Sequence, residues 1–124
     1  MRNETVQYFS KKEESIAHLL IELGIHRNVA WVLVFFARTP EATSHDIEHG
    51  TGLRQPEISL AMKQMTDRGW IACRSPLAGQ TGRKKKVYEL ATTLKAIVDS
   101  IENEKKQEAE KRLGRLKKLQ TYLP

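Results

Sequence analysis

Apolar side chains near the start of the chain recur at the spacing of an amphipathic helix. The helix predicted between Ser10 and Gly24 has one apolar face, formed by Ile16, Leu19, Leu20 and Leu23. Ser10 and Glu13 form a capping-box pattern at its start, and Gly24 is a residue type at which helices commonly end. The pattern therefore predicts a first helix that packs through one side.

The next apolar run, Val29–Ala37, has no polar face. Such a run is typical of a helix at the centre of a core. Asn28 is a suitable cap, so we expect a helix from Asn28 to about Arg38. The β-branched residues of the run also suit a buried strand, but the length of the run favours the helix.

Two further helices are predicted in the middle of the chain. Thr43 and Asp46 form a capping-box pattern that predicts a short helix through His49, followed by a turn at residues 50–52. The second helix is expected over residues 55–68. One face of this second helix carries Ile58, Ala61, Met62 and Met65. The opposite face carries Pro56, Ser59, Leu60 and Lys63.

The remaining pattern predicts two strands and one long helix. The strands are expected at residues 70–74 and 84–90, joined by a loop, and Thr92 or Thr93 caps a helix that continues to about Tyr122. The predicted fold is mainly α with a small β-hairpin: a winged helix-turn-helix with an N-terminal helix and a long C-terminal helix. We expect the winged helix-turn-helix domain over residues 1–91 and a C-terminal helix over residues 92–124.

Residues 44–63, SHDIEHGTGLRQPEISLAMK, resemble the helix-turn-helix of winged-helix transcription regulators, most closely the ArsR and MarR-like groups of bacteria and archaea. Residues 64–71 match the way such a recognition helix ends at glycine before two apolar residues. The resemblance covers about residues 43–90. It implies that the helix at 55–68 enters the major groove of double-stranded DNA.

The chemistry of that helix suits contact with DNA. Gln55 can offer a bidentate amide to adenine, Ser59 can bond to a base or a phosphate, and Lys63 can pair with guanine or phosphate. Leu60 suits a thymine methyl group, a protein contact or a single surface leucine. The predicted contact residues in this region are Arg54, Gln55, Pro56, Glu57, Ser59, Leu60 and Lys63.

Positive charge is concentrated in the last third of the chain. Lysine and arginine total 21 against 15 acidic residues, a net charge of +6. Residues 1–82 hold nine basic and nine acidic residues, so the whole excess lies in residues 83–124. Clustered positive charge favours a polyanion such as nucleic acid or an anionic membrane surface. The candidate contacts of the predicted hairpin are Gln80, Thr81, Arg83, Lys84, Lys85 and Lys86. Lysines that protect an edge strand from aggregation are the alternative.

The final helix carries apolar residues that need a partner. The expected dimerisation residues are Leu94, Ile97, Ile101, Leu113, Leu116, Leu119 and Leu123. A helix of about 30 residues is about 45 Å long, more than a small domain covers. We therefore expect pairing with the same helix of a second copy, with a frayed tail as the alternative. A homodimer implies a palindromic DNA site.

Other chemistry finds little support in the sequence. His45 and His49 have a spacing that suits a metal, but no third ligand is evident, so we expect solvated histidines and no cofactor. Cys73, the single cysteine, is expected to be a packed strand residue, and a thiol sensor is the alternative. No catalytic constellation and no signal-peptide pattern are present, so a non-enzymatic protein of the cytoplasm that does not bind membranes is expected.

These observations predict a homodimeric, sequence-specific regulator of transcription that binds double-stranded DNA. Two alternatives remain. One is a winged-helix module that binds another protein, which Leu60 and the leucine-rich final helix would suit. The other is an architectural or RNA-binding protein without sequence preference. The sequence does not indicate a small-molecule effector or a target site.

Overall fold

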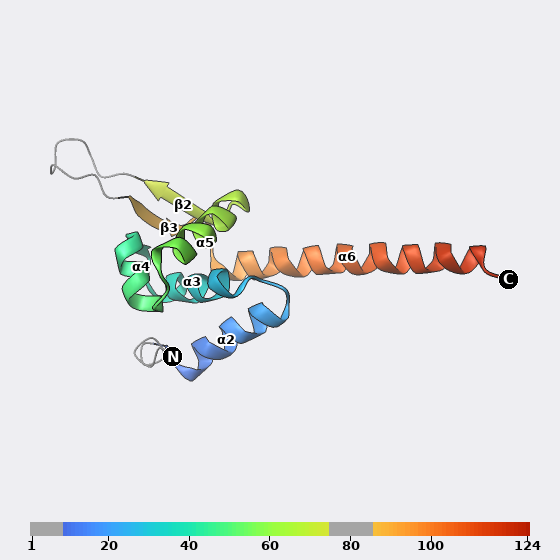
Figure 1. The fold of residues 1–124 in the computed structure, drawn as a ribbon, viewed down its shortest axis with the longest axis horizontal. Coiled ribbons are helices and arrows are strands. Elements are labelled where there is room, and N and C mark those ends of the chain that lie inside the picture. Colours follow the sequence, from blue (N-terminus) through green and yellow to red (C-terminus); the bar gives the residue numbers. More distant parts are fainter. Residues whose placement is uncertain (1–8, 75–85) are drawn as a thin grey trace. The chain divides into compact units, whose positions relative to one another are not determined.

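A computed structural model describes residues 9–74 and 86–124 of the chain (Figure 1). The described residues form two units that divide between Thr92 and Thr93. The first unit contains the helices α2 (Lys11–Glu22), α3 (Arg27–Arg38), α4 (Ser44–Thr51) and α5 (Gln55–Asp67), with the strands β1 (Glu41–Ala42), β2 (Ile71–Arg74) and β3 (Val87–Leu90). The second unit consists of the helix α6 (Leu94–Tyr122). The predicted fold class, mainly α with a small β-hairpin, is confirmed.

Side-chain caps start four of the described helices, and three of these caps involve a hydroxyl group. The Ser10 N–H donates to Glu13 Oε1 at 2.8 Å, and the Glu13 N–H donates back to Ser10 Oγ at 3.1 Å. Thr43 and Asp46 make the same reciprocal pair at the start of α4, at 3.0 and 3.2 Å. Thr93, rather than Thr92, caps α6, because its hydroxyl accepts the Ala96 N–H at 3.0 Å. Both predicted capping boxes are confirmed.

Two predicted helix boundaries are wrong. Asn28 is not the cap of α3, because the helix begins at Arg27, one residue before Asn28. The cap is His26, whose Nδ1 accepts the Asn28 N–H at 3.1 Å. The predicted turn at 50–52 is also displaced, because Gly50 and Thr51 continue α4. Only Gly52 leaves the helix, with a φ of 78° in the left-handed region that favours glycine.

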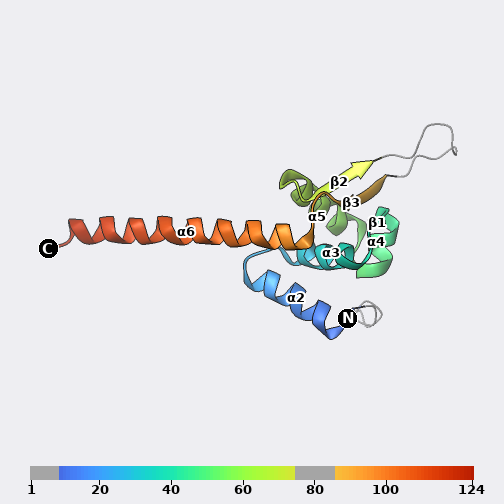
Figure 2. The ribbon, with the colours of Figure 1, turned by 180° about the vertical axis from the view of Figure 1, so that it is seen from behind.

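Helix α3 lies at the centre of the first unit and contacts α2, α4 and α5 (Figures 1 and 2). Its buried residues, as the apolar run predicted, are Val29, Ala30, Val32, Leu33, Val34, Phe35 and Phe36. Helix α5 buries the face formed by Ile58, Ala61, Met62 and Met65, which confirms the wheel prediction. In α2, however, Leu20 is buried whereas Leu19 and Leu23 are 59% and 46% exposed, so the predicted apolar face is only partly covered.

The three strands form an antiparallel sheet in the order β1-β3-β2. Tyr88 of the central strand β3 pairs with Cys73 of β2 on one side and with Ala42 of β1 on the other. Strand β1 was not predicted from the sequence. Arg74 on β2 and Glu41 on β1 form an ion pair of 2.6 Å that links the two outer strands.

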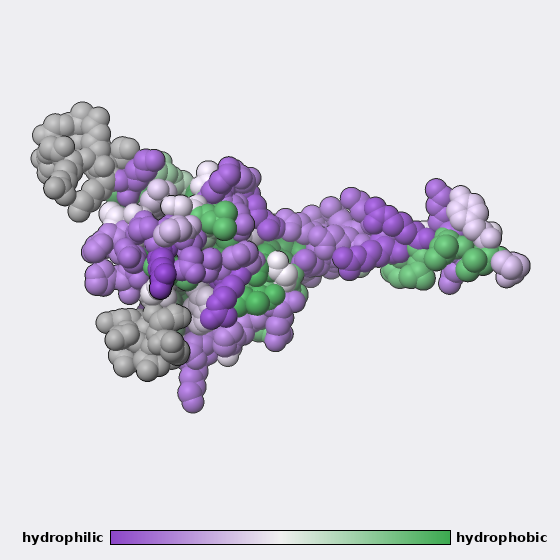
Figure 3. Space-filling view, viewed as in Figure 1, coloured by the Kyte–Doolittle hydropathy of each residue, from purple (hydrophilic) through white to green (hydrophobic). Residues whose placement is uncertain are grey.

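The second unit is a single helix of 29 residues, α6. Near its C-terminal end Leu113, Leu116, Leu119 and Leu123 are exposed, and Figure 3 shows this hydrophobic group. Ile97 and Ile101 are buried and Leu94 is half-buried. Surface ion pairs such as Lys106 with Glu102, at 3.4 Å, support the charged middle of the helix. None of the described helices combines the length and the apolar character that a bilayer span requires.

Candidate nucleic-acid interface

One side of α5 is open to solvent along its whole length. The predicted contact residues Arg54, Gln55, Pro56, Glu57, Ser59, Leu60 and Lys63 are all exposed. Leu60 is 49% exposed among these polar side chains. The described residues therefore present the predicted recognition surface as one continuous helical face.

The start of α5 is held by a carboxylate. The Arg54 N–H donates to Glu57 Oε1 at 2.9 Å, whereas the Arg54 side chain makes no capping bond. An acid three residues after the cap position is the signal for this contact, and it places the negative charge at the positive end of the helix. Glu57 therefore stabilises its own helix, a role that the sequence analysis missed.

Gln55 is also held in position. Its Nε2 donates to Glu48 Oε1 on α4 at 2.9 Å. The contact joins the two helices on either side of the turn that begins at Gly52. The amide of Gln55 is therefore oriented before any ligand arrives.

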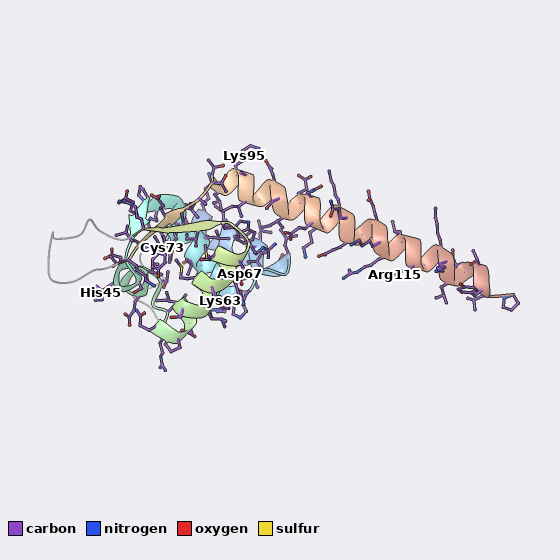
Figure 4. The ribbon with its side chains drawn as sticks, turned by 90° about the horizontal axis from the view of Figure 1, so that it is seen from above. His45, Lys63, Asp67, Cys73, Lys95 and Arg115 are labelled. Atoms are coloured by element: carbon purple, nitrogen blue, oxygen red, sulfur yellow. The ribbon has the colours of Figure 1, made fainter. Side chains whose placement is uncertain are left out.

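A groove of about 360 Å³ with both polar and apolar lining runs between α5 and the β2-β3 hairpin. Its polar lining consists of Ser44, Gln55, Ser59, Lys63, Thr66, Cys73, Lys86 and Tyr88. Figure 4 shows Lys63 on α5 and Cys73 on β2. Hydroxyl and ammonium groups are common contacts to DNA phosphates. Ser44 and Thr66 were not predicted as site residues, because only the folded chain brings them beside Lys86.

The charges of the groove are accessible. Lys63 forms only a long ion pair of 3.7 Å with Asp67, and both side chains are exposed (Figure 4). Lys86 is exposed at the start of the hairpin's second strand. The other predicted hairpin contacts, Gln80, Thr81, Arg83, Lys84 and Lys85, lie outside the described residues.

Cys73 and Tyr88, which lie opposite each other on β2 and β3, also line the groove. Burial raises the pKa of the Tyr88 hydroxyl above its ordinary value, and the neighbouring Cys73 thiol adds to the effect through charge repulsion and a hydrogen bond. Tyr88 therefore stays neutral at physiological pH. Cys73 is exposed, so the prediction of a packed strand residue is wrong. The groove opens beside this end of β2, whereas Ile71 at the other end is buried.

The two histidines of α4 lie close together but are not part of a larger ligand set. The rings of His45 and His49 are 4.8 Å apart between centroids and nearly perpendicular. Within residues 9–74 and 86–124, no group of three or more histidine, cysteine or acidic side chains could hold a metal. The absence of a metal site in the whole chain stays a prediction.

Comparison with known proteins identifies the fold. No protein-family model and no curated protein sequence matches the chain. Among solved structures, a possible transcriptional regulator from Methanosarcina mazei Go1 matches with a TM-score of 0.65 at 13% identity, over 85% of this chain and 86% of that one. S. aureus MepR in its DNA-binding conformation matches with a TM-score of 0.51 at 17% identity, over 92% and 91%. The chain has a winged-helix fold.

A third winged-helix match is a larger protein. This crystal structure of a transcriptional regulator gives a TM-score of 0.53 at 12% identity over 69% of the present chain, which spans 54% of the other protein's length. In winged-helix terms, α4 and α5 are the two helices of the helix-turn-helix, and β2 and β3 are the strands of the wing. The winged-helix resemblance inferred from residues 43–90 is confirmed at the level of the fold.

Proposed function

We propose that the chain is a sequence-specific regulator of transcription that binds double-stranded DNA as a homodimer. The exposed polar face of α5 beside a groove that carries Lys63 and Lys86 is the observation on which the proposal rests. A major groove admits one helix, and the hairpin beside it would meet the flanking backbone. The solved regulators with the same fold support this function.

The proposed contacts divide by chemistry. Gln55, Ser59 and Leu60 face the base edges, where an amide, a hydroxyl and an apolar group can each discriminate among bases. Phosphates along the groove are bound by two lysines and two hydroxyl residues: Lys63, Lys86, Ser44 and Thr66. Arg83, Lys84 and Lys85, which lie outside the described residues, are proposed as further phosphate contacts. The function requires no catalytic residue and no cofactor.

The proposed dimer uses the exposed leucines of α6. Leu113, Leu116, Leu119 and Leu123 form an apolar stripe that a second copy would cover. A twofold dimer would place two α5 helices about 34–36 Å apart, one turn of DNA. The expected site is therefore an inverted repeat.

Selection of bound duplexes from a random library tests the proposal. The full chain should enrich one inverted repeat with half-sites about one helical turn apart. Enrichment of no sequence would overturn sequence-specific binding, and enrichment of a single half-site would overturn the dimer.

Leu60 favours a second candidate function, a winged-helix module that binds another protein. A leucine that is 49% exposed on the recognition face suits a protein contact as well as a thymine methyl group. Light scattering separates the two functions, because the regulator should form a stable dimer by itself, whereas the module should be monomeric or aggregate without its partner.

A further inference from the structure

We infer that Glu48 is a positioning residue that makes Gln55 select adenine over guanine; the inference rests on the proposed function. Glu48 lies on α4 and Gln55 begins α5, seven residues later. The Gln55 amide donates one N–H to Glu48 Oε1 at 2.9 Å. This bond fixes which hydrogen-bonding groups of Gln55 remain for a base.

The turn between the two helices keeps Glu48 and Gln55 at this separation. The Gly52 N–H donates to the carbonyl of Glu48 at 2.9 Å, and Gly52 has the left-handed conformation that ends α4. The buried Thr51 hydroxyl donates to the Ile47 carbonyl at 2.7 Å and accepts the Leu53 N–H at 3.1 Å. The hydrogen bond between Gln55 and Glu48, called the tether below, therefore joins two backbone segments that are already fixed. This lowers the conformational entropy that is lost when the bond forms.

A tethered glutamine can bond to adenine but not fully to guanine. A free amide has two N–H donors and one oxygen acceptor. With one N–H held by Glu48, one donor and the oxygen remain. Adenine offers N7 as an acceptor and N6–H as a donor, so both remaining groups find partners. Guanine offers N7 and O6, which are both acceptors, and the Gln55 oxygen would face one of them without a hydrogen.

Because Glu48 is negatively charged, its removal should affect general duplex affinity and base discrimination in opposite directions. A carboxylate near DNA repels phosphates, so its loss should leave the affinity for unrelated duplexes unchanged or higher. The same change frees the second N–H of Gln55 and lets the amide rotate, so discrimination should fall. A loss of general contacts would lower affinity for all sequences instead.

The experiment compares four variants on the selected site and on copies with each adenine of the half-site changed to guanine. The wild-type chain should prefer adenine at one base pair of each half-site by about fivefold or more, the range of a bidentate contact. Gln55→Ala should lose this preference, and Glu48→Ala should reduce it while binding unrelated duplexes at least as well. Glu48→Gln should keep it, because the new amide oxygen still accepts the Gln55 N–H.

Asp67→Ala is the matched control for loss of negative charge. Asp67 is an exposed acid at the end of α5. Its removal should raise the affinity for all duplexes without changing the ratio of adenine to guanine. Circular dichroism of each variant establishes that it folds.

The outcomes separate the inference from the proposed function. A Glu48→Ala chain that keeps the adenine preference which Gln55→Ala loses would overturn the tether alone. A Gln55→Ala chain with unchanged preference would also overturn it, while DNA binding stands. A wild-type chain that binds no duplex would overturn both.

Discussion

Gly50 has no room for a side chain. A Cβ atom at this position would lie 2.3 Å from Cε1 and 2.7 Å from Cδ1 of the Phe35 ring. Phe35 is buried in α3 and meets Phe36 edge-on, with ring centroids 5.4 Å apart. The glycine thus lets α4 approach α3 closely, at the cost of its poor helix propensity.

Gly50→Ala should therefore destabilise the protein by about 1–3 kcal/mol, because overpacking outweighs the gain in helix propensity. Gly114→Ala is the matched control, since no described atom beyond the adjacent residues and the nearby backbone of α6 lies within 4 Å of its added Cβ. That change should stabilise the chain by about 1 kcal/mol through helix propensity. Urea denaturation measures both values. Stabilisation by the change at Gly50 would contradict the close approach.

Caps show how far residue identity alone predicts local structure. Ser10 and Thr43 were predictable because the capping partner of each lies three residues away in the sequence. The His26 cap was missed because histidine is not a usual capping residue and Asn28, two positions later, is. The role of Glu57 was missed because a capping box usually begins with serine or threonine, and the cap position here is Arg54.

At the scale of elements, the spacing of apolar residues along the chain predicted the helices but not the shortest strand, β1. Helices α3 and α5 carry long regular patterns, and both were found with boundaries correct to within a residue. Strand β1 spans two residues and exists only through its pairing with Tyr88 and Glu89, which lie far away in sequence. The exposure of Leu19 and Leu23 was likewise not predictable. The spacing of apolar residues shows which face of a helix is apolar, but not whether another element covers that face.

The leucines of α6 carry the prediction of the dimer. A Leu116→Gln/Leu119→Gln variant removes two exposed apolar side chains, of which Leu116 is 52% exposed, and keeps helix propensity. It should convert the dimer to a monomer in analytical ultracentrifugation. Leu60→Gln, the control, changes an exposed leucine of α5 and should leave the dimer intact while altering duplex preference. A dimer that survives the double change would contradict pairing through α6.

For the whole molecule, the sequence predicted the exposed face of α5 but not the groove. The face follows from one helical wheel, whereas the groove joins Ser44 of α4, Thr66 of α5 and Lys86 beside β3. Residues so far apart meet only through tertiary packing. The concentration of positive charge in residues 83–124 was visible in the sequence, but the placement of Lys63 opposite the hairpin was not.

The salt dependence of duplex affinity tests DNA binding through this groove most directly. The groove variant is Lys63→Ala/Lys86→Ala, and the control is Lys95→Ala/Lys106→Ala, which removes two exposed lysines from α6. Lys95 matches Lys63 closely, since each pairs with an aspartate four residues later. Both variants lose the same formal charge.

Each phosphate contact contributes about 0.9 to the slope of log affinity against log salt. The groove variant should therefore lose about two units of slope relative to wild type, whereas the α6 control should keep the wild-type slope. Equal slopes for the groove variant and wild type would contradict the account.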